Sequence, residues 1–252
     1  MIVFYQFVTP TYYVIKTTCS FLSLVTYNDF LLLVSTRSEN MNLKEIQGEY
    51  DAIFSLGHLC LTALQLRKMN KRPYAGPFDW VGSSSLPDLC RLIRNRFEGF
   101  MDPINLRVTG YSTGVATQDP FISVTDDHYC IDSAHDFKAD RNTLDNLATY
   151  HEVIEKFNRR FNRFLEMTST AQRALFVRTS GTMQEAKELE EVLSNLVTND
   201  FSILLINHTN VSGIVENHWP LKNVCAVELP DQEIWQSNDL YWSEMFQGIT
   251  IR

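Results

Sequence analysis

The sequence predicts an α/β domain in which helices flank a mixed, partly parallel β-sheet. Strand-like and helix-like segments alternate over residues 174–207, and this order is typical of parallel strands joined by a right-handed crossover. The chain has 252 residues, of which 44% are apolar, and this is enough to bury a sizeable core. A turn-rich, β-like stretch at 104–133 leaves an α+β architecture as the alternative if its hairpins dominate.

The predicted elements begin with a buried strand over 51–57, which ends at a glycine. A helix follows over 58–70, and residues 71–85 form a loop rich in proline, glycine, serine and aromatic side chains. The next helix begins at Ser85, because this serine can cap it, a proline stands in its first turn and Asp88 follows three positions on.

The second half of the chain contains the βαβ-like pattern. A long amphipathic helix is predicted over 141–167, since apolar side chains recur there at intervals of three and four residues. A capping box from Thr182 to Glu185 opens a further helix. Short apolar runs predict the remaining elements, which are strands at 174–178, 201–207 and 223–229 and a short aromatic, amphipathic element at 240–246.

The composition excludes several classes of function. Lysine and arginine number 22 against 30 aspartates and glutamates, a net charge of −8, whereas a nucleic-acid binder needs a clustered basic surface. The sequence contains no glycine-rich phosphate loop, zinc-protease motif or zinc-finger spacing, so we expect no cofactor and no metal. Five widely spaced cysteines are typical of a reducing, cytoplasmic protein rather than a disulfide scaffold.

The first forty residues differ from the rest. Residues 1–36 carry only Lys16 and Asp29 as charges, but each uncharged run is shorter than the roughly 20 residues that a membrane span needs. We therefore predict a hydrophobic N-terminal extension over 1–40 and a single domain over 41–252. The interpretation that we favour is that translation begins at Met41; packing on the domain and a membrane-proximal segment are the alternatives.

The segment Ser55–Cys60 (SLGHLC) is the most informative part of the sequence. A strand ends at Gly57 and a helix begins almost at once, so Cys60 falls in the first helical turn. The unpaired N–H groups and the positive end of the helix dipole lower the pKa of a thiol at such a position. The alternative is a cysteine that only fills space between strand and helix.

A reactive thiol needs a histidine that accepts its proton, and the two need only be near in space. Of the six histidines, His135 has the best context, because it follows the strand-like run ending at Ser133, where the chain is expected to leave the sheet. His58 is nearest to Cys60 in sequence, but residues two apart on a helix diverge. His208 follows a strand end and is kept in reserve.

A third group should orient the imidazole by accepting its second ring proton. Asp79 is the candidate, because its loop, Gly76–Trp80 (GPFDW), follows the Cys60 helix and contains a stiffening proline. The same carboxylate could instead cap a turn.

Four arginines form a second candidate set. Arg159, Arg160, Arg163 and Arg178 could together bind an anionic group. A solvated helix face is the explanation that we favour.

These motifs resemble a known family. Ser55–Cys60, Gly76–Trp80 and the run Leu92–Phe100 are similar to the opening of the uncharacterised domain described as a papain-like cysteine peptidase, and His135–Phe137 and Leu175–Arg178 are similar to its later blocks. The resemblance covers about residues 45–246, and it implies that Cys60 is the nucleophile and His135 the base. Papain-like α+β folds continue after the histidine with antiparallel strands, whereas a long helix and a βαβ pattern follow His135 here.

The leading hypothesis is a cytoplasmic cysteine-dependent hydrolase acting on an acyl or amide bond of a peptide, amide or small-molecule substrate. Cys60 would attack the carbonyl, His135 would protonate the leaving group, and backbone N–H groups at the helix start would stabilise the oxyanion. The alternatives are a non-catalytic α/β binding module and a glycan-modifying enzyme that uses the same pocket. No nucleic-acid partner is expected, membrane contact depends on residues 1–36, and the sequence does not indicate an oligomeric state.

Overall fold

The computed structural model describes residues 14–17, 20–27, 30–35, 40–113 and 119–252. The chain divides into two compact units, Met1–Glu39 and Asn40–Arg252, which are described separately. In the first unit, three strands form an antiparallel sheet in the order β1-β2-β3. Their bounds are β1 (Val14–Thr17), β2 (Ser20–Tyr27) and β3 (Phe30–Ser35).

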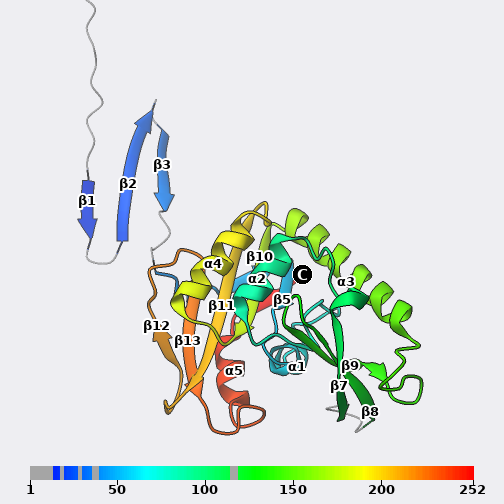
Figure 1. Ribbon diagram of the computed structural model, residues 1–252. Helices are drawn as coiled ribbons and strands as arrows, with labels where there is room; N and C mark the ends of the chain where they lie inside the picture. Colours follow the sequence, from blue (N-terminus) through cyan, green and yellow to red (C-terminus); the bar gives the residue numbers. More distant parts are fainter. Residues whose placement is uncertain (1–13, 18–19, 28–29, 36–39, 114–118) are drawn as a thin grey trace, which may run out of the picture. The chain divides into compact units, whose positions relative to one another are not determined.

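The second unit contains a five-stranded sheet in the order β12-β13-β11-β10-β5 (Figure 1). Neighbouring strands are parallel except at the edge strand β12. The strands are β5 (Ala52–Ser55), β10 (Arg173–Thr179), β11 (Asp200–Thr209), β12 (Val215–Asn217) and β13 (Val224–Pro230). The predicted α/β class with a mixed, partly parallel sheet is confirmed.

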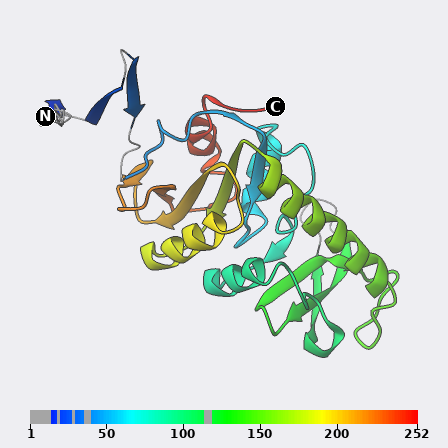
Figure 2. The same ribbon diagram turned by 90° about the horizontal axis from the view of Figure 1, so that it is seen from above.

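Helices cover both faces of this sheet. They are α1 (Leu61–Lys68), α2 (Leu86–Arg94), α3 (Tyr150–Thr170), α4 (Met183–Ser194) and α5 (Asp239–Met245). Figure 2 shows α2 and α4 side by side on one face and α5 on the other. Within the described ranges, no helix combines the length and the apolar character needed to cross a membrane.

The β-like stretch at 104–133 forms a separate antiparallel sheet in the order β6-β9-β8-β7. Its strands are β6 (Val81–Gly82), β7 (Leu106–Thr113), β8 (Pro120–Asp126) and β9 (Ile131–Lys138), and the short 3₁₀ helix η1 (Pro103–Asn105) precedes β7. A parallel pair of short strands, β4 (Gly48–Tyr50) and β14 (Ile249–Ile251), joins the two ends of the unit. The hairpins therefore form a second layer beside the α/β sheet and do not replace it.

Alternation along the parallel strands produces two apolar cores. Phe176 and Leu205 point to the face that α2, α3 and α4 cover, whereas Val177 and Leu204 point to the face that α1 and α5 cover. Because side chains of a strand alternate between faces, the near-continuous apolar strands of a doubly covered sheet supply both cores. The Cys60 helix α1 thus lies on one face, and the histidine-bearing antiparallel sheet packs against the core of the other.

The N-terminal caps predicted for α2 and α4 are confirmed. The Ser85 hydroxyl accepts a hydrogen bond from the backbone N–H of Asp88. Thr182 and Glu185 form the reciprocal capping box. Both caps satisfy N–H groups that have no partner within the helix.

The long helix begins later than the periodicity predicts. The sequence predicts a start at 141, but α3 begins at Tyr150. The Asn142 side chain accepts hydrogen bonds from the backbone N–H and the hydroxyl of Thr149, and Thr143 pairs with Asn146. These local bonds offer the backbone an alternative to the helix, so the prediction for 141–149 is wrong.

Candidate functional site

The Cys60 thiol lies where strand β5 turns into helix α1. Cys60 is the N-terminal cap residue of α1: its carbonyl accepts the first helical hydrogen bond, from the N–H of Leu64, and its side chain caps no N–H group. The first N–H groups of a helix have no partner within it, and α1 has no acidic side chain in its first turn. The helix start therefore offers donors to a developing negative charge next to the thiol.

The environment of Cys60 favours the neutral thiol. The residue is half-buried, and this burial raises the pKa of the thiol, although a hydrogen bond from its own backbone N–H opposes the rise. Position at a helix start alone predicts a lowered pKa, so burial has the larger effect here. The thiol is protonated near neutral pH and needs a base in order to react.

The other described cysteines differ from Cys60 in burial or in setting. Cys90 and Cys225 are fully buried, and burial raises the pKa of Cys90 to about 12 and that of Cys225 further still. Cys130 is exposed, but it lies in a turn beside Asp88, where burial and that carboxylate raise its pKa. Cys19 lies outside the described residues. Cys60 is thus the described cysteine that combines access with a helix start.

The sequence predicts that His135 follows the end of a strand, but the structure places it within strand β9. The strand continues to Lys138 because its later residues pair again with β8. The ladder shifts between Ser133 and Phe137, so that Ala134, His135 and Asp136 stand opposite a single residue of β8. Such bulges redirect side chains and are frequent beside active sites.

The imidazole of His135 is half-buried and lies against an aromatic ring. The ring of Phe121 meets it edge to face, with 5.9 Å between ring centres. The Nδ1 atom is buried and has no hydrogen-bond partner among the described residues. Burial lowers the pKa of His135, and the charge of Asp136 partly opposes this. The imidazole is therefore neutral near pH 7 and able to accept a proton.

Asp79 is held by its own loop. Its Oδ2 atom accepts hydrogen bonds from the Arg72 guanidinium at 2.7 Å and from the Gly76 N–H at 2.6 Å, and the side chain is almost fully buried. Continuing the β6–β9 register would bring Asp79 opposite His135, but residues 77–80 are a turn. Within the described residues, no hydrogen bond joins the Asp79 carboxylate, the His135 imidazole or the Cys60 thiol to another of the three.

Strand β6 links the cysteine loop to the histidine strand. The N–H of His58 donates to the Ser83 hydroxyl, and the N–H of Ser83 donates to the His58 carbonyl. One residue before Ser83, Gly82 pairs with Asp132 of β9. Gly57 has a φ of +75°, and a Cβ there would lie 3.3 Å from the Phe78 carbonyl. The SLG and GPFDW motifs are therefore in direct contact.

Arg178 holds these segments together and is not part of a solvated face. The residue is completely buried, and its guanidinium donates to the Leu56 carbonyl, to the Ser83 hydroxyl and carbonyl, and to the Ser180 carbonyl. The sequence did not predict this role, because Leu56 and Ser83, which supply most of its acceptors, lie far from Arg178 along the chain. Its place in an otherwise apolar strand was the available signal.

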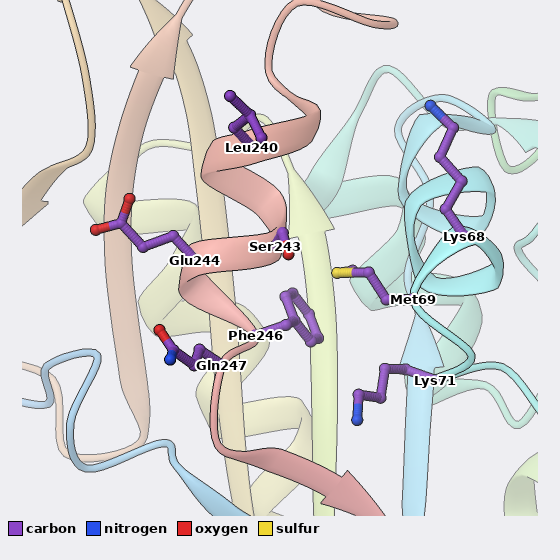
Figure 3. Close-up of a pocket in the computed structure, with 8 residues that line it drawn as sticks. All are labelled: Lys68, Met69, Lys71, Leu240, Ser243, Glu244, Phe246 and Gln247. Carbon is purple, nitrogen blue, oxygen red and sulfur yellow. The ribbon is translucent and has the colours of Figure 1, made fainter.

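A surface depression of the domain lies away from this chemistry. It has a volume of about 740 Å³ and lies between the end of α1 and helix α5. Figure 3 shows Met69 reaching toward Phe246 between the two helices, with Lys68 and Lys71 on the α1 side. Lys68 is at the opposite end of α1 from Cys60, about 12 Å away along the helix axis. This depression cannot serve the thiol.

Comparison with known proteins identifies the family. A family model described as "Putative papain-like cysteine peptidase (DUF1796)" matches residues 51–211, which include β5, the SLG loop, Cys60, the GPFDW loop, His135 and Arg178. The chain belongs to this family. Similarity extends to "Uncharacterized protein R408" of Acanthamoeba polyphaga mimivirus, which is 27% identical over 217 residues covering 77% of this chain and 97% of that protein. No solved structure matches.

The family match begins at β5 and ends in the loop after β11. It contains all three segments that Arg178 joins, so the arginine lies inside the shared domain. The strand β13 and helix α5, which complete the sheet and cover one face, lie beyond it.

Proposed function

We propose that the protein is a thiol-dependent hydrolase that acts on an acyl or amide bond, with Cys60 as nucleophile and His135 as base. The observation that carries this proposal is the position of Cys60, half-exposed at an uncapped helix start inside the family's cysteine motif. A reducing compartment such as the cytoplasm suits a free nucleophilic thiol.

The protonation states support a general-base step. Burial raises the pKa of Cys60 and lowers that of His135, so both are neutral before reaction. As the sulfur attacks the carbonyl carbon, the imidazole takes the thiol proton, and it then gives that proton to the leaving group when the carbon–heteroatom bond breaks. Water hydrolyses the resulting thioester and restores the thiol. Catalytic hydrogen bonds often tighten only when substrate binds.

Asp79 takes the part of a positioning residue in this proposal. Its bonds to Arg72 and Gly76 fix the GPFDW loop, and the loop carries Trp80, over whose ring the Arg67 and Arg72 guanidiniums lie at 5.6 and 5.4 Å. The loop precedes β6, which pairs with the histidine strand. Asp79 therefore acts by holding the GPFDW loop, and with it the start of β6, in place.

The experiment is acyl transfer from p-nitrophenyl acetate, with the modified residue located by mass spectrometry. We expect the acetyl group on Cys60, and His135→Ala should slow acylation by about 10²- to 10⁴-fold, the range of general-base contributions. Cys130→Ala and His151→Ala are matched controls, because both residues are exposed, and they should react as the wild type does. Acylation of Cys130 at the same rate as Cys60, or an unchanged rate in folded His135→Ala, would refute the dyad.

A further inference from the structure

A second pocket, in which polar side chains lie among apolar ones, is found at the carboxyl end of the parallel sheet. It has a volume of about 180 Å³ and is lined by residues that follow β5, end β10 and β11, or lie after β13. These residues are His58, Leu59, Leu61, Thr179, Ser180, Asn207, His208 and Ile234. Ligands of open α/β sheets bind at this end of the strands. The Cys60 side chain does not line the pocket, although its neighbours Leu59 and Leu61 do.

We propose that this pocket binds a small oxyanion, a phosphoryl or carboxylate group, between the imidazoles of His58 and His208. The volume corresponds to roughly six water molecules, which suits such a group with a few attached atoms. No acidic side chain lines the pocket.

A positive charge acts on one of the pocket residues, because the charge of Arg178 lowers the pKa of His58. Arg178 stays protonated at neutral pH, since burial lowers its pKa only to about 10. Its hydrogen bonds go to neutral acceptors, and one of these, the Ser180 carbonyl, belongs to the pocket wall. In the described part of the chain it has no ion pair with a carboxylate. Glu185, a carboxylate whose charge raises the pKa of Arg178, is engaged in the capping box. A buried cation without an anionic partner is costly, and the Arg178 charge, which does not itself line the pocket, would attract an oxyanion there through space.

One of the two histidines, His208, has unused hydrogen-bonding capacity. The Nε2 atom of His208 is buried and has no partner among the described residues, although buried polar atoms are nearly always paired. Burial lowers the pKa of both histidines. The charge of Arg178 lowers the pKa of His58 further. The charge of His58 lowers the pKa of His208 further, and Asp231 opposes that shift. An anion between the rings would raise both pKa values and supply the missing acceptor.

Two residues that line the pocket have unusual backbone conformations. His58 and Ser180 have φ values of +65° and +67°, a region that residues other than glycine rarely adopt. Such strain persists where the surrounding structure enforces it, and it clusters at ligand sites. Helix α4 begins just after Ser180 and Gly181, with Thr182 as its cap. A metal centre is not indicated, since the described residues contain no group of three metal-ligating side chains.

The test is a titration of the full chain with inorganic phosphate and, separately, with acetate, each at constant ionic strength set with chloride, followed by NMR of the histidine ring signals. The His58 and His208 signals should shift saturably, while those of the exposed His128 and His151 should not. Saturation by phosphate alone indicates a phosphoryl ligand, and saturation by acetate alone indicates a carboxylate.

Variants separate this site from the thiol site. His58→Gln and His208→Gln should each weaken binding by about tenfold or more, a loss of about 1.4 kcal/mol, whereas His151→Gln and Cys60→Ser should leave it unchanged. The proposal is overturned if the His58 and His208 ring signals do not shift with phosphate or acetate, or if chloride shifts them equally. It is also overturned if both glutamine variants still saturate at the wild-type concentration of the anion. Failure of acyl transfer at Cys60 would leave this result unaffected.

Discussion

Replacing Ser83 by alanine tests the junction between the cysteine loop, β6 and Arg178. The Ser83 hydroxyl accepts hydrogen bonds from Arg178 at 2.6 Å and from the His58 N–H at 3.1 Å, and the residue is completely buried. The change removes one oxygen and creates almost no cavity, so the lost hydrogen bonds dominate its effect. A bond to a charged group contributes about 1.5–3 kcal/mol, and an unpaired buried donor costs about 1–3 kcal/mol.

Arg178 keeps its bonds to the Leu56, Ser83 and Ser180 carbonyls, which reduces the sum. We therefore expect Ser83→Ala to lower the free energy of unfolding by roughly 2–4 kcal/mol, or the melting temperature by roughly 4–16 °C for a domain of this size. Urea unfolding followed by circular dichroism measures it, with an unchanged m value.

Ser84→Ala is the matched control, because Ser84 is the adjacent residue and is exposed. If Ser83→Ala were no more destabilising than Ser84→Ala, the hydroxyl would not be a structural acceptor, and Arg178 would not bind the three segments together through it.

Two further predictions concern the core and the pH dependence. Phe164 is fully buried among the rings of Phe54, Phe78, Phe97 and Phe176, so Phe164→Ala should cost about 3–5 kcal/mol in urea unfolding, and a cost near that of an exposed change such as Leu240→Ala would contradict the packing. His58, His135 and His208 have pKa values lowered from 6.5 in the folded protein, so the unfolded chain binds more protons as the pH falls below about 6.5. The free energy of unfolding should therefore be highest above that pH and decline toward pH 5.5, and the decline should be less steep in His208→Gln. A urea midpoint that stays constant or rises as the pH falls over this interval would contradict the lowered pKa values of these histidines.

The two proposed sites share one scaffold. The loop from Leu56 to Cys60 carries His58 toward the oxyanion pocket and Cys60 to the start of α1. Ser83 and Arg178 hold this loop by hydrogen bonds to its backbone. Because both sites depend on the same buried hydrogen bonds, damage to Arg178 should impair both, whereas changes at Cys60 or His208 should impair one.

Much of the fold follows from local patterns. The apolar runs of β10, β11 and β13 and the caps at Ser85 and Thr182 depend on neighbours in the chain, so the sequence predicts them well. The position of Cys60 at a strand-to-helix junction is likewise local. These features determined the α/β class, the family resemblance and the candidate nucleophile.

The rest depended on contacts between distant segments. His135 lies in a bulge because of how β8 and β9 pair, and the turn at residues 77–80 keeps Asp79 out of the β6–β9 ladder. Arg178 looks like a surface cation in sequence, yet it is buried, and Leu56 and Ser83, far from it along the chain, supply its partners. By itself, the sequence determined which residues carry reactive groups. Only the tertiary structure decided their partners, because strand register and the burial of a charge are set by segments that meet only in the folded chain.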